Sequence, residues 1–174
     1  MQIITVENKN SEKFLRKKTE DFKFSEFEKR ALKELVEKMR NTMKKADGIG
    51  LSANQIGIGK KFFIVQIPLQ DEGGAIIREK FYAIFNPKII KLSKKTAVME
   101  EGCLSMPGLY GPVERPERIV LEGYNQNGKK IKIEASGLLA RVFQHEMDHL
   151  EGKLFVDRAK SDDIKHAPKY DKLN

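Results

Sequence analysis

Apolar residues recur at helical spacing in a first segment, residues 25–46. Its apolar positions, which fall on one face of a helix with about 3.6 residues per turn, are Phe27, Leu32, Leu35, Met39, Met43 and Ala46. Ser25 and Glu28 have the spacing of a capping box, and Gly48 follows as a natural stop. The pattern predicts an amphipathic helix over residues 25–46.

A second segment with this spacing is GLLARVFQHEMDHLE, residues 137–151. Its apolar side is made by Leu138, Leu139, Val142, Phe143, Met147 and Leu150. Gly152 occupies the position that a helix C-cap favours. We therefore expect a second amphipathic helix that ends at Gly152.

Strand-like segments lie between these two helices. KFFIVQIPL (61–69) and FYAIFNPKII (81–90) are rich in β-branched and aromatic residues, and DEGG (71–74) begins the turn region between them. The segment 117–136 contains two further strands around Asn127-Gly128, which is a strong hairpin signal. The order predicts an α+β fold with an N-terminal helix and antiparallel or mixed β-sheets.

Length and composition fit one globular domain. The chain has 174 residues, of which 40% are hydrophobic and 33% charged, and no linker or repeat divides it. We expect residues 1–174 to form a single domain, with 159–174 as a short polar tail. No apolar run is long enough to cross a bilayer, and the N-terminal segment lacks the order of a signal peptide. The single cysteine excludes an internal disulfide and fits a reducing cytoplasm, so we expect a cytoplasmic protein without a membrane partner.

The net charge of +8 comes mostly from scattered lysines. No stripe of aromatic and basic residues accompanies this charge, which favours a solvated surface over a specific nucleic-acid partner. The charge does allow a transient contact with the ribosome.

The glycine-rich segment DGIGLSANQIGIGK, residues 47–60, places Gly48, Gly50 and Ala53 at the spacing of a dinucleotide-binding loop. Such a loop needs a strand before the glycines and a helix after them. Here the predicted helix comes first, and its negative C-terminal end would repel a phosphate. We exclude the nucleotide-binding interpretation.

The sharpest signal is HEMDH, residues 145–149. His145 and His149 are one helical turn apart, so they project from the same face and can hold one metal ion. Glu146, beside the first ligand, can then reach a water on that ion. Two of the three histidines in the chain have this spacing, whereas His166 lies in the polar tail, where we expect it to be solvated.

A catalytic site of this kind usually needs a third protein ligand. Zinc proteases with HExxHxxGxxH would place a histidine at residue 155, which is Phe155 here, and no glutamate follows Glu151. Asp157 is conceivable as the third ligand. Cys103, in the segment EEGCLSMPG between strands, is the better candidate, although an isolated cysteine is more often a buried inert residue.

The chain resembles the peptide deformylases. Three motifs carry the resemblance in the family's order: GIGLSANQ (48–55) against the family's GφGφAAxQ, EGCLS (101–105) and QHEMDH (144–149). The segments FLRKKTEDF and EGKLFVDR also look like family segments, so the likeness runs from about residue 14 to residue 158.

The resemblance implies a hydrolase that removes the formyl group from the N-terminal formyl-methionine of nascent chains. It implies one divalent ion per chain on Cys103, His145 and His149. Fe²⁺ is the usual physiological ion of the family, and Ni²⁺, Co²⁺ or Zn²⁺ can replace it in a purified sample. The HEMDH helix would then be the central metal-binding helix of the fold.

The resemblance also implies roles for individual residues. Glu146 is the general base and acid, and the Gln55 amide with the Leu104 backbone N–H stabilises the oxyanion. The residues expected to bind the substrate are Ile49, Gly50, Glu101, Leu138 and Val142. Two other readings stay open on the residues alone: an HExxH metallopeptidase of another lineage, and a non-catalytic relative that binds peptides or the ribosome.

Two of the next three positions depart from the family's common pattern, and the third, Arg115, agrees with it. Ser52 replaces the first of two alanines, a small change for which we expect little cost. Tyr110 stands where many members carry an arginine near the peptide's exit path. Arg115 lies where the family often has an arginine, behind the metal ligands. The C-terminal segment is short and contains Pro168, which argues against ribosome docking through a long basic helix.

Overall fold

The structure is a computed structural model, and it describes residues 1–70 and 76–166. The described residues form an α+β fold with three α-helices: α1 (Lys9–Leu15), α2 (Lys29–Lys45) and α3 (Gly137–Leu150). A five-stranded sheet has the order β1 (Gly50–Ser52), β2 (Phe62–Gln70), β3 (Ile76–Leu92), β6 (Arg118–Tyr124) and β7 (Lys130–Ser136). A three-stranded sheet contains β4 (Thr96–Cys103), β5 (Met106–Pro116) and β8 (Lys165–His166). Neighbouring strands are antiparallel in both sheets.

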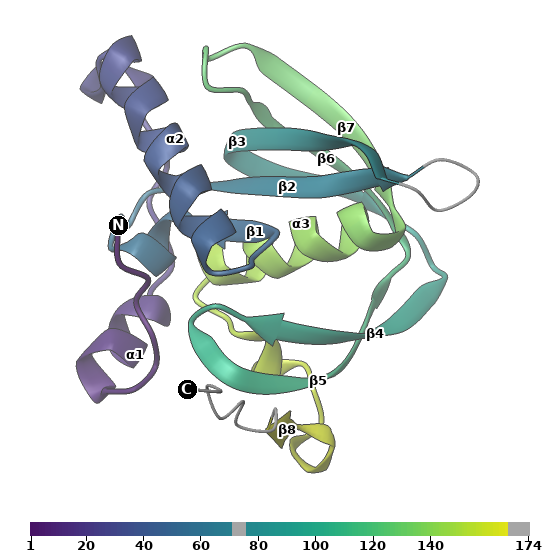
Figure 1. Ribbon diagram of the computed structural model, residues 1–174. Helices are drawn as coiled ribbons and strands as arrows, with labels where there is room; N and C mark the ends of the chain where they lie inside the picture. Colours follow the sequence, from purple (N-terminus) through teal and green to yellow (C-terminus); the bar gives the residue numbers. More distant parts are fainter. Residues whose placement is uncertain (71–75, 167–174) are drawn as a thin grey trace.

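Helix α3 lies between the two sheets, as Figure 1 shows. Its apolar face packs against the larger sheet in a cluster that includes Phe63, Val65, Leu121, Ala140 and Phe143, all buried. Its other side faces β4 and β5. Because the helix is covered on both sides, most of its residues are buried, and its polar side chains must find partners inside the protein.

Strand β2 is buried on both faces, which explains its nearly continuous apolar sequence. Phe63 and Val65 point toward α3, whereas Phe62 and Ile64 belong to a second cluster with α2. Helix α2 contributes Leu32, Val36, Met39 and Met43 to this cluster. The large sheet is therefore held between two helices at β2.

The predicted helix over 25–46 is wrong at its start. Ser25 lies in a short 3-10 helix, Phe24–Glu26, and α2 begins only at Lys29, after Glu28, which makes no side-chain cap bond. The aromatic rings explain why the helix begins later. Phe27 stacks on Phe22 at a centroid distance of 4.7 Å, which keeps the backbone of Phe27 extended.

The stop of this helix is also different from the prediction. Asp47, not Gly48, has a left-handed backbone, with φ of 53°. Gly48 lies close to Leu104 instead, since a Cβ there would come within 2.6 Å of Leu104 Cδ1, so a larger residue would require this side chain to shift.

The other predicted elements are confirmed, with β3 longer than expected at its N-terminal end. The hairpin closes through a bond from the Gly128 N–H to the Asn125 carbonyl, and Gly128 has a φ of 75°. The turn predicted at DEGG lies outside the described residues. Helix α1 and strands β1, β4 and β5 were not predicted. Among the described residues, no helix has the length and apolar character needed to cross a membrane.

Candidate metal centre

Cys103, His145 and His149 converge although they come from two different elements. Cys103 is the last residue of β4, and the two histidines lie one turn apart on α3. His149 Nε2 lies 3.2 Å from Cys103 Sγ and 3.2 Å from His145 Nε2. All three candidate ligand atoms fall within 4.8 Å of one another.

This geometry fits a metal ion. An ion with tetrahedral zinc-like bond lengths would hold its nitrogen and sulfur ligands about 3.3–3.6 Å apart, close to the observed separations. A thiolate with two imidazoles suits Fe, Co, Ni or Zn. Three protein ligands leave a fourth position for water or substrate.

The electrostatics of the cluster also favour a cation. Burial opposes ionisation of the Cys103 thiol, but His149 and His145 outweigh it, so the pKa of the thiol is well below its usual value. Burial would lower the pKa of His145, but Cys103 and Glu101 outweigh it and raise this pKa to about 10. The cluster therefore holds positive charge strongly, and a metal ion can take the place of the proton.

Glu101 fixes the orientation of His145. One carboxylate oxygen, Oε2, lies 2.9 Å from His145 Nδ1, which leaves the Nε2 side of the ring for the metal. The same carboxylate accepts bonds from Arg115 Nε at 2.6 Å and Arg141 Nη1 at 2.8 Å. Burial would raise the pKa of Glu101, but Arg115 and His145 outweigh it and hold this pKa well below its usual value. Glu101 thus stays ionised.

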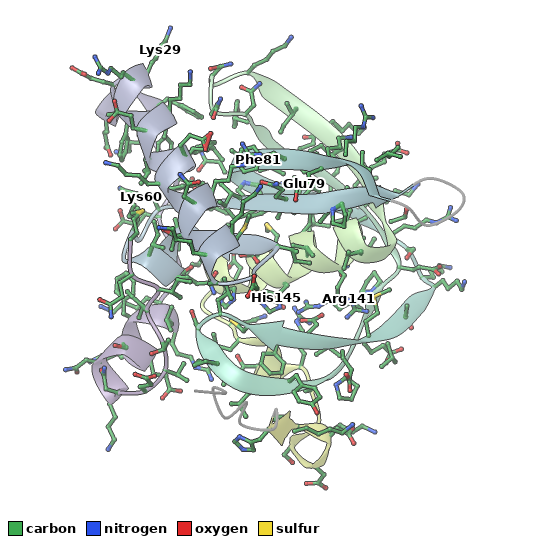
Figure 2. All side chains as sticks on the ribbon, viewed as in Figure 1. Lys29, Lys60, Glu79, Phe81, Arg141 and His145 are labelled. Carbon is green, nitrogen blue, oxygen red and sulfur yellow. The ribbon has the colours of Figure 1, made fainter. Side chains whose placement is uncertain are left out.

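Asp148 anchors the opposite end of this buried ionic network. It accepts from Arg115 Nη1 at 2.6 Å and from Arg158 Nε at 2.5 Å. Arg141 donates in addition to the carbonyls of Val113 at 2.7 Å and Ala97 at 2.6 Å, which ties α3 to both long strands of the smaller sheet. Figure 2 shows Arg141 and His145 on the side of α3 that faces β4.

Glu146 is buried without a full set of partners. Its side chain is 3% exposed, and its Oε2 has no hydrogen-bond partner among the described residues. Burial raises the pKa of Glu146 to about 7, against the lowering effect of His145 and His149. A buried carboxylate with a free oxygen and a pKa near neutrality can accept and return a proton.

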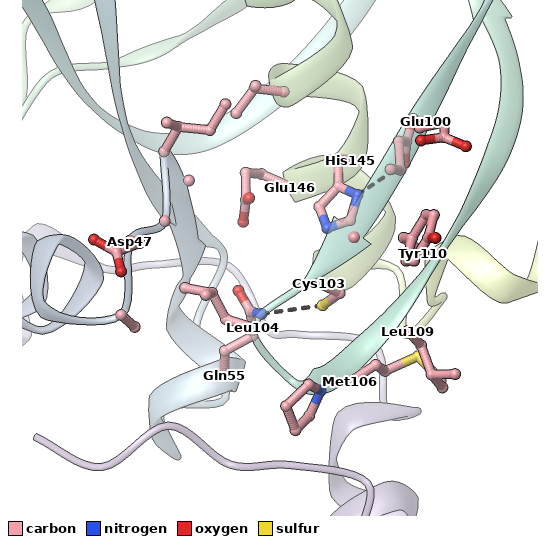
Figure 3. A pocket seen from close by; sticks show the side chains of 18 of the residues that line it. Asp47, Gln55, Glu100, Cys103, Leu104, Met106, Leu109, Tyr110, His145 and Glu146 are labelled. Atoms are coloured by element: carbon pink, nitrogen blue, oxygen red, sulfur yellow. Dashed lines mark hydrogen bonds and ion pairs between the residues drawn. The ribbon is translucent and has the colours of Figure 1, made fainter. Parts of the chain in front are cut away.

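Gln55 points its amide group at the cluster. Its Nε2 lies 3.5 Å from Cys103 Sγ and 3.1 Å from Ser105 Oγ, and its Oε1 accepts the backbone N–H of Ser52 at 2.9 Å. The donor end of the amide therefore faces the metal ligands (Figure 3).

A cleft of about 660 Å³ opens onto two of the three candidate ligands, Cys103 and His145, whereas His149 lies buried behind them. The cleft is lined by every residue expected to bind the substrate: Ile49, Gly50, Glu101, Leu138 and Val142. Gln55, Leu104 and Glu146 also line it, as Figure 3 shows. Ile49 and Leu138 are 39% and 44% exposed, so the cleft has an apolar rim. His166 lies apart from it, exposed on β8.

Several residues of this site were not predicted from the sequence. Arg141, Asp148 and Ser105 were not singled out, and Ser52 was noted only as a small substitution. Arg141 carried a usable signal, because it lies one turn before His145 on the predicted helix, and a cation beside a metal site requires an anionic partner.

Comparison with known proteins identifies the relatives of this chain. The family model described as polypeptide deformylase matches residues 1–165. Peptide deformylase 2 of Gloeobacter violaceus is 43% identical over 130 residues, which cover 75% of this chain and 67% of the relative. The peptide deformylase of Elusimicrobium minutum is 41% identical over 152 residues, 87% of this chain and 85% of the relative. A probable peptide deformylase from Synechococcus phage S-SSM7 superposes with a TM-score of 0.78 at 39% identity and covers 91% of this chain and 99% of the solved one.

Proposed function

The chain belongs to the polypeptide deformylase family, and from this premise we propose that its cleft hydrolyses the formyl group of N-terminal formyl-methionine on newly synthesised polypeptides. The observation that carries the proposal is the meeting of Cys103, His145 and His149 beside the free carboxylate oxygen of Glu146. This proximity supports the proposal, because the reaction needs both a metal ion and a proton acceptor.

We expect one divalent ion on these three ligands, Fe²⁺ in the cell and Ni²⁺, Co²⁺ or Zn²⁺ in purified samples. The soft donor set and the family's preference support this assignment. When bound, the ion supplies a Lewis acid that polarises the formyl carbonyl and acidifies a water molecule.

Glu146 is the proposed general base and acid. Its free Oε2 takes a proton from the attacking water, whose oxygen forms a bond to the formyl carbon. The carbon–nitrogen bond then breaks, Glu146 gives the proton to the departing amine, and formate is released. The pKa near 7 suits both halves of this cycle.

Two donors are proposed to stabilise the negative charge on the formyl oxygen: the Gln55 amide and the Leu104 backbone N–H. The methionine side chain would occupy the apolar part of the cleft formed by Ile49, Leu138 and Val142. The peptide backbone would run along Ile49 and Gly50, which line the cleft.

The partner we propose is therefore the nascent formyl-methionyl peptide, met in the cytoplasm. A transient contact with the ribosome is compatible with the net charge of +8.

The test is an assay of the purified protein on formyl-Met-Ala-Ser, with formate release and metal content measured on the same sample. Acetyl-Met-Ala-Ser and a longer blocked peptide serve as controls for other hydrolytic activities. Glu146→Gln should retain the metal and lose about 10²–10⁴-fold in turnover, whereas Glu134→Gln, on the exposed side of β7, should behave as wild type. Cleavage of internal peptide bonds would instead indicate a metallopeptidase, and metal binding without turnover a binding protein.

A further inference from the structure

The residues that lead into α1 form two backbone hydrogen bonds with segments that flank the cleft (Figure 1). The Ile4 N–H donates to the Gln55 carbonyl at 2.8 Å, and the Val6 N–H donates to the Ser105 carbonyl at 3.0 Å. Gln55 lies in the short helix after β1, whereas Ser105 lies in the turn between β4 and β5. Residues 3–6, the bridging segment, therefore connect the larger sheet to the smaller one beside the candidate metal centre.

The two carbonyls adjoin both of the proposed oxyanion donors. Gln55 itself carries the donor amide, and Ser105 directly follows Leu104, whose backbone N–H is the other donor. The Gln55 amide nitrogen also donates to Ser105 Oγ at 3.1 Å, which links the same two places through their side chains. The bridging segment adds a second link, through the backbone.

The side chains of the bridging segment divide between the same two layers. Ile3 packs against the apolar cluster of α2 and β2, which Leu104 also contacts. Val6 packs against the cluster that contains Met106, and Cys103 packs there as well. Apolar packing therefore holds the segment in place at both of its ends.

The spacing of the two donors suits an extended chain. Backbone N–H groups two residues apart point to the same side of such a chain, so Ile4 and Val6 can reach both carbonyls together. The N–H of Thr5, between them, points to the other side. Among the residues that the structure describes, no backbone carbonyl accepts it.

We infer that Ile4 and Val6 are positioning residues that hold the two oxyanion donors at a fixed separation through their backbone N–H groups. This inference rests on the proposed function. An oxyanion donor acts only when it is directed at the place where the charge develops. Without the two bonds, the Gln55 helix and the Leu104 turn could move apart, and their donors would no longer converge on one oxygen.

The kinetic test uses proline, which has no backbone N–H. In Ile4→Pro and in Val6→Pro, kcat on a formyl-methionyl peptide should fall about twofold to tenfold, the range for one hydrogen bond. KM and metal content should stay unchanged. Thr5→Pro is the matched control, because it introduces the same ring and removes an N–H that binds no backbone carbonyl of the described residues.

A Gln55→Ala background separates positioning from general destabilisation. There Ile4→Pro should have no further effect on kcat, because the amide that it positions is gone. Val6→Pro acts through Leu104 and should still lower kcat in this background. A merely structural role would lower the melting temperature of both variants without this difference.

Unchanged kcat in both Ile4→Pro and Val6→Pro would overturn the inference. An equal loss in Thr5→Pro would also overturn it, because the ring and not the lost bond would then be the cause. If the proline variants do not fold, the α-hydroxy acid analogue of valine at residue 6 replaces the N–H by an oxygen and keeps the side chain. The same fall in kcat is expected from this ester, and an unchanged kcat would contradict the inference.

A second measurement does not depend on turnover. In the Zn²⁺-loaded protein, the nuclear Overhauser effect between the Gln55 side-chain amide protons and the Ser105 β-protons reports the approach of the two segments. It should weaken in Ile4→Pro and Val6→Pro and persist in Thr5→Pro. An undiminished effect in both would contradict the inference even if the peptide assay failed, whereas an inactive wild type with the expected weakening would contradict only the proposed function.

Discussion

Cys103 and Glu146 face the same cleft, and burial opposes the ionised form of both side chains. Cys103 is compensated by two imidazoles, so the pKa of its thiol is lowered and the thiolate is available as a ligand. For Glu146 the neighbouring histidines offset less of the cost of burial, so its pKa rises to about 7. The charges around each group therefore favour Cys103 as a metal ligand and Glu146 as a base.

Replacement of Cys103 by serine should weaken metal retention sharply, because a serine hydroxyl is a poorer ligand for these ions than a thiolate. Metal content after dialysis against a chelator, measured beside wild type, checks this. If Fe²⁺ is the ion, anaerobic purification should preserve wild-type activity. Stoichiometric metal and full activity in Cys103→Ser would mean that the third ligand lies elsewhere.

Replacement of Gln55 by alanine should lower kcat by about 10²–10³-fold, the range for removal of one oxyanion donor. KM should change little, since the substrate backbone would still lie along Ile49 and Gly50. Gln55→Glu should be no better, because its carboxylate would face the oxyanion with the wrong charge. Steady-state kinetics at matched metal content give the answer, with Gln126→Ala as a control. A rise in KM at unchanged kcat would mean that Gln55 only binds substrate.

The residues that could be predicted from the sequence are those whose geometry is local. His145 and His149 share a face because they lie one helical turn apart, and this requires no knowledge of the fold. The partners of Arg141 could not be found this way, since the carbonyl of Ala97 lies 44 residues away in the chain.

At the scale of elements, the site depends on how closely β1 approaches α3. Gly50 lies so near this helix that an added Cβ would overlap Glu146 Oε1 and would come within 2.9 Å of Val142 Cγ1. Strand β1 therefore packs directly against the side chain of Glu146, the proposed base.

Gly50→Ala should displace Glu146 and reduce turnover by an amount comparable to loss of the base, about 10²-fold or more. Metal content should be retained, because the atoms nearest to the added methyl group belong to Glu146 and Val142, which are not candidate ligands. Gly59→Ala, where a Cβ would meet nothing within 4 Å, is the matched control. Normal turnover in Gly50→Ala would show that β1 can move away from α3 without cost.

The elements themselves were predictable to different degrees. Helix α3 and the β6–β7 hairpin follow from local patterns, a helical apolar face and an Asn-Gly turn. The start of α2 was not predictable, because the ring of Phe27 packs against Phe22 and this tertiary contact overrides the capping signal of Ser25. Strands β4 and β5 do not have the pattern of apolar strands, because they bury the charged residues Glu101 and Arg115 as well as the apolar residues Met106 and Val113.

At the scale of the whole molecule, the candidate metal ligands join two layers that also meet through buried ion pairs and through Leu104, which follows β4 and packs against the cluster of α2 and β2. Cys103 belongs to the smaller sheet, whereas His145 and His149 belong to the helix that packs on the larger sheet. The buried network of Arg115, Glu101 and Asp148 spans the same boundary. An ion held by these three residues would therefore cross-link the two layers.

Removal of the metal should then lower the stability of the entire domain. A ligand present at about 100 times its dissociation constant stabilises the native state by about 2.7 kcal/mol, which for a domain of this size corresponds to about 5–10 °C in melting temperature. Thermal unfolding of the metal-loaded and chelator-stripped protein measures the difference, and re-addition of Zn²⁺ should restore it. Cys103→Ser should show a much smaller difference between the two states, because its affinity for the ion is reduced. Equal melting temperatures for loaded and stripped wild type would mean that the layers are held together without the ion, and that Cys103 and α3 are brought together by the Glu101–Arg115–Asp148 network alone.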